Sequence, residues 1–297
     1  MDRLDAWTPS VQTSRQIVQI GTSSMDRLAV LLDHFAFTAD SYHQGAFCGV
    51  SRHADGEATG QVHLLRGGRL SFETARGERQ DLVEPSLMLV IRPRAHQLST
   101  PDDSPAELVC ASLAFRGGPD NPLTRALPDY LVSPLRQLPG LAASADWLFA
   151  EAFGDHCGRG LVLNRLFELM IIQLLRQLLT RPSATPGMLA GLADRRLARA
   201  LTALHERPQQ AWTVAELAGL AGMSRAGFAA HFQRVVGSAP GDYLTRWRIA
   251  LAQQRLQQRR PLALIADEVG YESPSALARA FRRITGASPT EWQRAQA

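Results

Sequence analysis

Residues 213–243, TVAELAGLAGMSRAGFAAHFQRVVGSAPGDY, carry the pattern that decides the fold of the C-terminal third of the chain. A first apolar helical segment ends in a tight turn, and Ser224 has the side chain of a helix N-cap. Phe228 and Phe232 follow at helical spacing, and Gly237 stands where a helix stop needs a left-handed backbone. The stretch therefore predicts two short helices joined by a tight turn, which is a helix-turn-helix unit.

The same pattern returns at an offset of 48 to 49 residues, so that 262–294 repeats 213–248. The second copy has an N-cap at Ser273 and a helix stop at Gly286, and residues 243–257 predict one long helix between the copies. One such pattern is a weak signal. Two in tandem, with matching stops and a connecting helix, favour paired units over the alternative of a plain helical bundle.

Positive charge is concentrated in the same third of the chain. From Ala190 onward there are 15 arginines against 8 acidic residues, whereas the net charge of the whole chain is +4. All 32 basic residues are arginine. The absence of lysine is explained by biased codon usage, but the uneven placement of the charge predicts that the C-terminal third binds a polyanion.

The C-terminal segment resembles the DNA-binding domain of the AraC/XylS family of bacterial regulators over residues 195–295. The resemblance rests on WTVAELAGLAGMSRAGFAAHFQRVVGSAPGDYLTRWRIALA (212–252) and IADEVGYESPSALARAFRRITGASPTEWQR (265–294). It implies a sequence-specific transcription regulator with seven helices in this domain. The third and sixth of them, at about 224–236 and 273–284, would enter two successive major grooves of double-stranded promoter DNA.

The resemblance also assigns roles to individual residues. Alanine can contact a thymine methyl group but cannot read a base by hydrogen bonds, so we expect Arg279 in the second unit to choose the sequence. The base-reading positions are Ala226, Ala229 and Ala230 in the first unit, and Ser275, Ala276 and Arg279 in the second. The residues expected to cap the helices or to hold the DNA backbone are Ser224, Arg225, Arg234, Arg246, Ser273, Arg282 and Arg283.

Short apolar runs separated by Gly, Pro and Asp turns predict a small antiparallel barrel or sandwich between about residues 45 and 115. The segments VHLLRGGRLSFE (62–73) and EPSLMLVIRPRAHQL (84–98) resemble the cupin-type sensor domain that many AraC-type regulators carry. The expected fold class is therefore α+β multidomain. It combines an N-terminal cupin-like β-barrel with flanking helices and a C-terminal all-α domain of two tandem helix-turn-helix units.

Two amphipathic segments, 142–153 and 161–179, predict helices between these domains. The apolar band of the second segment is wide, so that it either packs on the barrel or supplies the interface of a homodimer. A short helix is expected from Met25, with Ser23 as its N-cap. The expected division is a flexible arm at 1–24, a sensor barrel at 25–118, a helical dimerisation region at 119–181, a linker at 182–193 and the DNA-binding domain at 194–297.

Two histidines of the barrel segment are candidate metal ligands. Metal-binding cupin enzymes have a His-x-His pair, a glutamate and a later histidine. Here His63 and His96 match this pattern, and Leu65 replaces the second histidine of the pair. Two ligands are few for a catalytic metal, so the alternatives are a metal ion, an anionic ligand or a hydrogen-bonded structural pair.

Cys48 and Cys110 are candidates for oxidant sensing, because cysteines stand at similar places in a subset of cupin-type regulators that respond to oxidants. A redox role requires an accessible thiolate, and the alternative is a buried, inert thiol. If both ideas hold, the two cysteines would share one pocket with His63 and His96. Cys157, between predicted helices, is expected to serve packing.

The sequence as a whole predicts a non-enzymatic regulator of the cytoplasm, without a membrane span, that senses a small ligand, a metal ion or an oxidant. Three cysteines without an export signal favour a reducing compartment. A contact with RNA polymerase is a further expectation. The alternatives are a cupin-type metalloenzyme with an incidental helical domain and an architectural DNA binder with little sequence preference.

Overall fold

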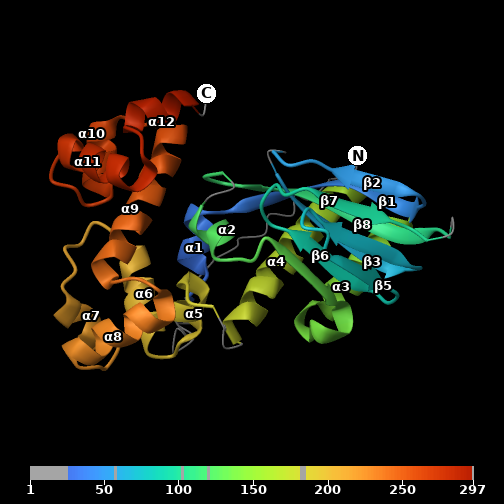
Figure 1. Ribbon diagram of the computed structural model, residues 1–297, viewed down its shortest axis with the longest axis horizontal. Coiled ribbons are helices and arrows are strands. Elements are labelled where there is room, and N and C mark those ends of the chain that lie inside the picture. The colour runs from blue at the N-terminus through green and yellow to red at the C-terminus, as the bar shows by residue number, and fades with distance from the viewer. Residues whose placement is uncertain (1–25, 57–58, 102–103, 119–120, 181–184, 296–297) are drawn as a thin grey trace, which may run out of the picture.

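The computed structural model describes residues 26–56, 59–101, 104–118, 121–180 and 185–295. Two parts lie side by side, a sheet-rich N-terminal part and a helical C-terminal part (Figure 1). Within the described residues, no helix has the length and apolar character that crossing a membrane requires. The expected arm at 1–24 lies outside these residues.

Two antiparallel sheets face each other in the N-terminal part, as the cupin-like barrel requires. The five-stranded sheet has the order β1 (Phe37–Phe47), β8 (Ala106–Phe115), β3 (Gly60–Gly67), β6 (Ser86–Val90) and β9 (Tyr130–Pro134). The four-stranded sheet has the order β2 (Val50–His53), β7 (His96–Ser99), β4 (Leu70–Thr74) and β5 (Arg79–Leu82). The apolar runs that predicted strands, at 62–65, 70–73, 87–91 and 108–115, coincide with β3, β4, β6 and β8, except that β6 ends one residue before its run does.

Successive side chains of a strand point to opposite faces of the sheet, and in the central strands β3, β6 and β8 most residues of both faces are buried. In β3, Val62 and Leu64 join a core with the helices, whereas Leu65 joins a second core between the sheets. The helical cover consists of α3 (Ala142–Phe153) and α4 (Arg159–Thr180). These helices confirm the two segments predicted from amphipathic spacing.

The boundary expected at residue 118 is wrong, because β9 pairs with β6 and completes the five-stranded sheet. The sequence of β9, YLVSP, does not alternate apolar and polar residues, and all five residues are half-buried. The sequence therefore contains no strand signal at this place. Strand β1 likewise begins at Phe37, before the predicted start of the strand region. Between β8 and α3 lie α2 (Pro122–Arg125), β9 and two 3-10 turns at Leu135–Gln137 and Pro139–Leu141.

The linker expected at 182–193 is wrong in its second half. Residues Met188–Ala193 form α5, a short helix whose Met188, Leu189 and Leu192 are buried. A Cβ on Gly191 would lie 2.4 Å from the Leu201 side chain, so a glycine permits this close packing. At the other end of the N-terminal part, α1 (Ala29–His34) follows a turn whose backbone N–H groups donate to Asp26, whereas the predicted cap Ser23 lies outside the described residues.

Seven helices, α6 to α12, form the C-terminal domain and match the number that the resemblance implies. The first unit is α7 and α8, the second is α10 and α11, and α9 connects them as one long helix (Figure 1). Their bounds are α6 Leu197–Glu206, α7 Val214–Leu220, α8 Arg225–Val236, α9 Pro240–Gln257, α10 Leu262–Glu268, α11 Pro274–Thr285 and α12 Pro289–Ala295.

The helix boundaries of both units follow from the predicted caps. Ser224 accepts a hydrogen bond from the Gly227 N–H at 3.2 Å, and Ser273 accepts one from the Ala276 N–H at 3.1 Å. Gly237 and Gly286 end α8 and α11 with φ angles of 83° and 82°, in the left-handed region that glycine adopts without strain. These four local signals were correctly predicted.

Arg248 on α9 binds both units at once. Its guanidinium donates to the carbonyl oxygens of Pro208 at 2.6 Å and Gln210 at 2.9 Å, in the loop before α7, and to that of Gly270 at 3.1 Å, in the turn before α11. The two loops touch here, since a Cβ on Gly270 would lie 2.5 Å from the Cα of Gln209. Arg248 therefore fixes the second unit against the first.

The two parts of the chain meet along the same helix. Trp247 of α9 packs edge-on against Phe35, the residue after α1, at 5.2 Å between ring centroids, and it stacks on His205 of α6 at 4.0 Å. The Gln254 amide donates to the His34 carbonyl oxygen. Helix α9 thus contacts the N-terminal part as well as both units.

We predict that Arg248→Ala lowers the free energy of unfolding of the C-terminal domain by about 3 kcal/mol, because it removes three charge-assisted hydrogen bonds from carbonyl groups of buried and half-buried residues. Arg255→Ala, on the same helix, removes an ion pair with Glu268 and should cost about 1 kcal/mol or less. Denaturant unfolding of both variants measures the difference. Equal losses would contradict the role of Arg248.

Candidate DNA-binding surface and sensor sites

The exposed face of α8, the first of the two helices expected to enter a major groove, has few groups that can form hydrogen bonds with DNA bases. Arg225, Ala226 and Ala230 are exposed and Ala229 is half-buried, while Phe228 and Phe232 hold the opposite face of the helix in the core. The exposed face offers methyl groups and one arginine near the start of the helix. This part of the surface can contact thymine methyl groups and phosphates, but it has few groups that read bases by hydrogen bonds.

The second recognition helix, α11, is richer in hydrogen-bonding groups. Ser275, Arg279 and Arg283 are exposed, and Ala276 is half-buried. Leu277 and Phe281 are fully buried and fix the orientation of the helix. All predicted base-reading positions of this unit therefore lie on or beside its exposed face.

Two arginines expected to bind the DNA backbone have partners within the chain. Arg282 forms an ion pair with Glu291 at 2.9 Å, and Glu291 also accepts from the Ser288 N–H at the start of α12. Arg234 lies 2.7 Å from Nδ1 of His231, whose Nε2 lies 2.8 Å from Asp194. These contacts hold the guanidinium groups at the C-terminal ends of α11 and α8.

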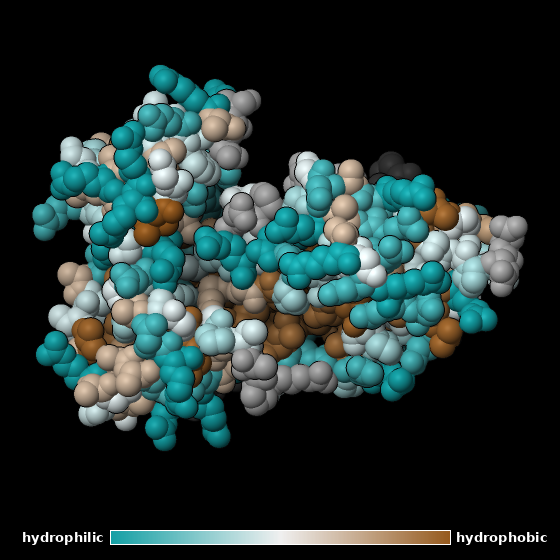
Figure 2. Space-filling view, viewed as in Figure 1, coloured by the Kyte–Doolittle hydropathy of each residue, from teal (hydrophilic) through white to brown (hydrophobic). Residues whose placement is uncertain are grey.

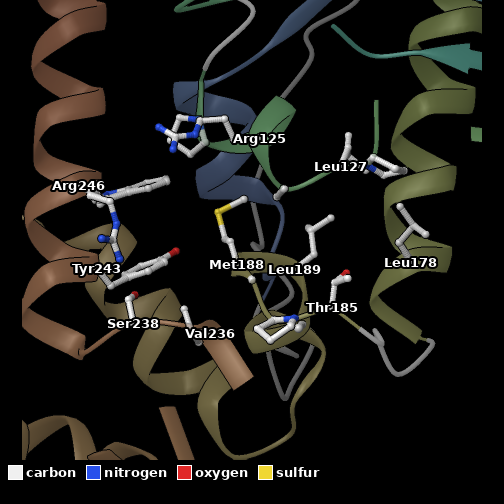
Figure 3. A pocket seen from close by; sticks show the side chains of 17 residues that line it. Arg125, Leu127, Leu178, Thr185, Met188, Leu189, Val236, Ser238, Tyr243 and Arg246 are labelled. Carbon is white, nitrogen blue, oxygen red and sulfur yellow. The ribbon is translucent and has the colours of Figure 1, made fainter. Parts of the chain in front are cut away.

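The remaining predicted contact, Arg246, is exposed and borders a cavity of about 750 Å³ between the two parts of the chain. In Figure 3, Met188 and Leu189 lie between Tyr243 and Arg246 of α9 on one side and Leu178 of α4 on the other. Apolar side chains gather in the hollow between the two parts (Figure 2). Sequence reasoning missed this cavity because its walls come from α2, α4, α5 and α9.

The structure brings the two predicted histidines together inside the barrel. Nε2 of His63 lies 3.0 Å from Nε2 of His96, and both side chains are buried. A third imidazole, His53 of β2, stacks on His96 with 4.4 Å between ring centroids and 2° between ring planes. His53 was missed because only the pairing of β2 with β7 places it opposite His96.

Comparison with known proteins identifies both parts. A family model described as cupin matches residues 26–180, and one described as helix-turn-helix domain matches residues 217–295. A Streptomyces antibioticus protein named as an AraC-like transcription regulator is 49% identical over 136 residues, which are 45% of this chain and 45% of that protein. The chain thus spans less than half the length of this relative.

Two further relatives match over more of their length. An uncharacterized HTH-type transcriptional regulator of Haemophilus influenzae is 32% identical over 202 residues, 67% of this chain and 66% of that protein. The RCS-specific HTH-type transcriptional activator RclR of Escherichia coli is 29% identical over 236 residues, 78% of this chain and 83% of that protein.

The chain belongs to the AraC-type transcription regulators with an N-terminal cupin domain. This assignment confirms the resemblance inferred from the tandem units and from the barrel segments. It makes the exposed faces of α8 and α11 the candidate DNA-binding surface of this chain.

The cysteines of this AraC-type regulator do not form the pocket that the sequence predicted. Cys110 is buried beside His63, its cross-strand neighbour, whereas Cys48 is exposed after β1 and receives a hydrogen bond from the Thr100 hydroxyl at 3.9 Å. Burial raises the pKa of the Cys110 thiol to about 12, against a smaller lowering by the Tyr42 hydroxyl. A buried thiol with a raised pKa is not ionised at neutral pH, so Cys110 has the properties of the buried, inert cysteine that was the alternative to a redox role. Cys157, expected to serve packing, is exposed.

We predict that iodoacetamide at pH 8 alkylates Cys48 and Cys157 of the folded chain but leaves Cys110 unmodified. With a pKa of about 12, roughly one Cys110 thiol in ten thousand is ionised at this pH, and the side chain is buried. Peptide mass spectrometry measures the modification, and denatured protein provides the control in which all three react. Alkylation of Cys110 at the rate of Cys48 in folded protein would contradict the raised pKa.

Proposed function

We propose that this chain acts in the cytoplasm as a sequence-specific regulator of transcription, binding promoter DNA with α8 and α11 in two successive major grooves. The observation that carries the proposal is that one continuous helix, α9, connects the two units, and that the predicted reading faces of α8 and α11 are exposed. A non-enzymatic role agrees with the names of the relatives, which are those of regulators.

The two units differ in their proposed roles in DNA recognition. Arg282 and Arg234 lie near the C-terminal ends of the recognition helices, where contacts with phosphates are expected, and each already has a partner in the chain, Glu291 or His231. Among the ion pairs between described residues, Arg279 takes part in none. Its guanidinium can therefore turn toward a guanine without giving up a partner in the chain, and α11 chooses the sequence.

We expect Arg279→Ala to relax discrimination at one base pair by about 1–3 kcal/mol, because a two-hydrogen-bond contact with a base edge is lost. Selection from randomised duplexes with the natural protein first defines the site, and competition binding then compares single base changes. Arg283→Ala on the same helix is the matched control. It should weaken binding to all sequences alike. The slope of the logarithm of the binding constant against the logarithm of the salt concentration should become smaller in magnitude by about 1.

Unchanged selectivity in the Arg279→Ala variant would refute the assignment to that residue. Binding without sequence preference in the natural protein would instead indicate an architectural DNA binder.

The effector of the regulator is proposed to bind in the cavity between the two parts. A molecule there contacts α2 of the sensor part, α5, and Tyr243 and Arg246 of α9, so it bears on the placement of the DNA-binding domain. Leu127, Leu178 and Met188 supply an apolar wall, and the exposed Arg125 and Arg246 stand at its edge. This lining suits a small apolar molecule with an anionic group. Such a ligand changes DNA binding only if it prefers one arrangement of the parts.

We expect Leu178→Trp to fill part of this cavity and to reduce the binding of 1-anilinonaphthalene-8-sulfonate, an apolar anionic fluorophore, several-fold. The matched control is Leu169→Trp, the same substitution on the same helix at a partly exposed residue that does not line the cavity. Fluorescence titration of the full chain measures both, with circular dichroism to verify the fold. Equal binding by the two variants would rule out this cavity as the site of the probe.

The proposal includes a homodimer and a contact with RNA polymerase. Trp147 of α3 and Leu161 of α4 are 58% and 74% exposed, and they give the helical cover of the barrel apolar side chains for a second copy. A homodimer would place two DNA-binding domains on one promoter.

A further inference from the structure

We infer that His53, His63 and His96 form a binding site for one divalent transition-metal ion of the class that prefers imidazole ligands, with zinc as its representative. The site joins the two sheets of the barrel, because His63 belongs to β3 of the five-stranded sheet, whereas His53 and His96 belong to β2 and β7 of the four-stranded sheet. One ring nitrogen from each of the three lies within 4.8 Å of the others. This inference does not depend on where the effector binds.

The spacing of the imidazoles fits a small ion after modest movement. Two nitrogen ligands at 2.0–2.1 Å from a tetrahedral ion are about 3.3 Å apart. The Nε2 atoms of His63 and His96 are 3.0 Å apart, so they need to separate by only a few tenths of an ångström. His53 has further to move, and it is half-buried, with a ring nitrogen 3.3 Å from the Ser51 hydroxyl. Because His53 is partly exposed to solvent, an ion can reach the buried His63 and His96 from its side.

The hydrogen bonds around the cluster orient the nitrogens as a metal site requires. The Arg94 carbonyl oxygen can only accept, so Nδ1 of His96, 2.9 Å away, carries the hydrogen and leaves Nε2 with its lone pair toward His63. Ligating histidines usually donate their other N–H in this way, to a carbonyl or carboxylate oxygen. The second nitrogen of His63 lies 3.5 Å from the Tyr42 hydroxyl, which is itself hydrogen-bonded to Cys110.

Ion binding needs no net loss of a proton from His63. Without an ion, His63 Nε2 donates its hydrogen to His96 Nε2. With an ion, the hydrogen moves to His63 Nδ1 and is donated to the Tyr42 oxygen, while the Tyr42 hydroxyl donates to Cys110. The neutral imidazole is the form of histidine that ligates a metal ion.

The donor set selects the kind of ion. Three imidazoles without a carboxylate suit Zn²⁺, Cu²⁺, Ni²⁺ or Co²⁺ and do not suit Mg²⁺ or Ca²⁺, which prefer oxygen ligands. The set departs from the cupin-enzyme pattern, because the third histidine comes from β2 and Leu65 stands where that pattern has a histidine. A structural pair of histidines would account for the contact of His63 with His96, whereas a metal ion would also account for the third imidazole stacked on His96.

The test is titration of the chelator-treated full chain with ZnCl₂ in a calorimeter, followed by titration with CoCl₂ monitored by absorption. We expect one high-affinity Zn²⁺ per chain, and visible cobalt d–d bands without a thiolate-to-cobalt charge-transfer band. His53→Ala, at a half-buried position, should weaken Zn²⁺ binding at least tenfold. His156→Ala, which changes an exposed histidine outside the barrel, should leave binding unchanged.

Three outcomes would overturn the site. They are a His53→Ala variant that binds Zn²⁺ as tightly as the natural chain, loss of the bound ion in His156→Ala, and a cobalt spectrum with a thiolate charge-transfer band. Circular dichroism and DNA binding of His53→Ala verify that the variant is folded, so that a loss of Zn²⁺ binding reports on the site.

Discussion

The arrangement of the DNA-binding domain depends on the hydrogen bonds of Arg248. A helix-turn-helix unit is too small to fix the position of a neighbouring unit through its own core, and α9 alone fixes the distance between the units but not how their loops meet. The guanidinium supplies this constraint by donating to Pro208 and Gln210 on one side and to Gly270 on the other. Burial lowers the pKa of Arg248, but arginine stays charged at neutral pH, so the three bonds persist.

Three consecutive residues of α9 connect this constraint to the rest of the chain. Arg246 borders the cavity between the two parts, Trp247 packs between Phe35 and His205, and Arg248 holds both units. A change in the cavity therefore acts on the same helix turn that positions the recognition helices. This adjacency gives a physical route from an effector to the DNA-binding surface. It requires only that the effector prefer one of two arrangements of α9 against α1 and α5.

Much of the C-terminal domain could be predicted from the sequence because its signals are local. Ser224 and Ser273 cap helices within three residues, and Gly237 and Gly286 end helices through their own φ angles. The features that were missed depend on residues far apart in the chain. Strand β9 exists because it pairs with β6, and His53 joins His63 and His96 only through strand pairing. The short helix α5 resembled a linker because its six residues are too few to show helical periodicity.

The candidate sites also include some that follow from local sequence patterns and others that depend on residues far apart in the chain. The exposed face of α11 follows from the repeat, since Leu277 and Phe281 mark the buried side and leave Arg279 outside. The cavity between the parts and the third histidine are tertiary features, which one-dimensional patterns do not contain. The two cysteines do not share the expected redox pocket, because Cys48 is exposed after β1 whereas Cys110 is buried within β8.

The central claim, that two rigidly joined units read two successive major grooves, is tested most directly by changing the spacing of the DNA. Once the site is known, 5 base pairs, about half a helical turn, are inserted between the segments that the two units contact, and affinity is measured at fixed salt. The account predicts that binding falls to the level of a DNA carrying one segment only, because the second groove then faces away from α11. Affinity that is unchanged by the insertion would contradict it.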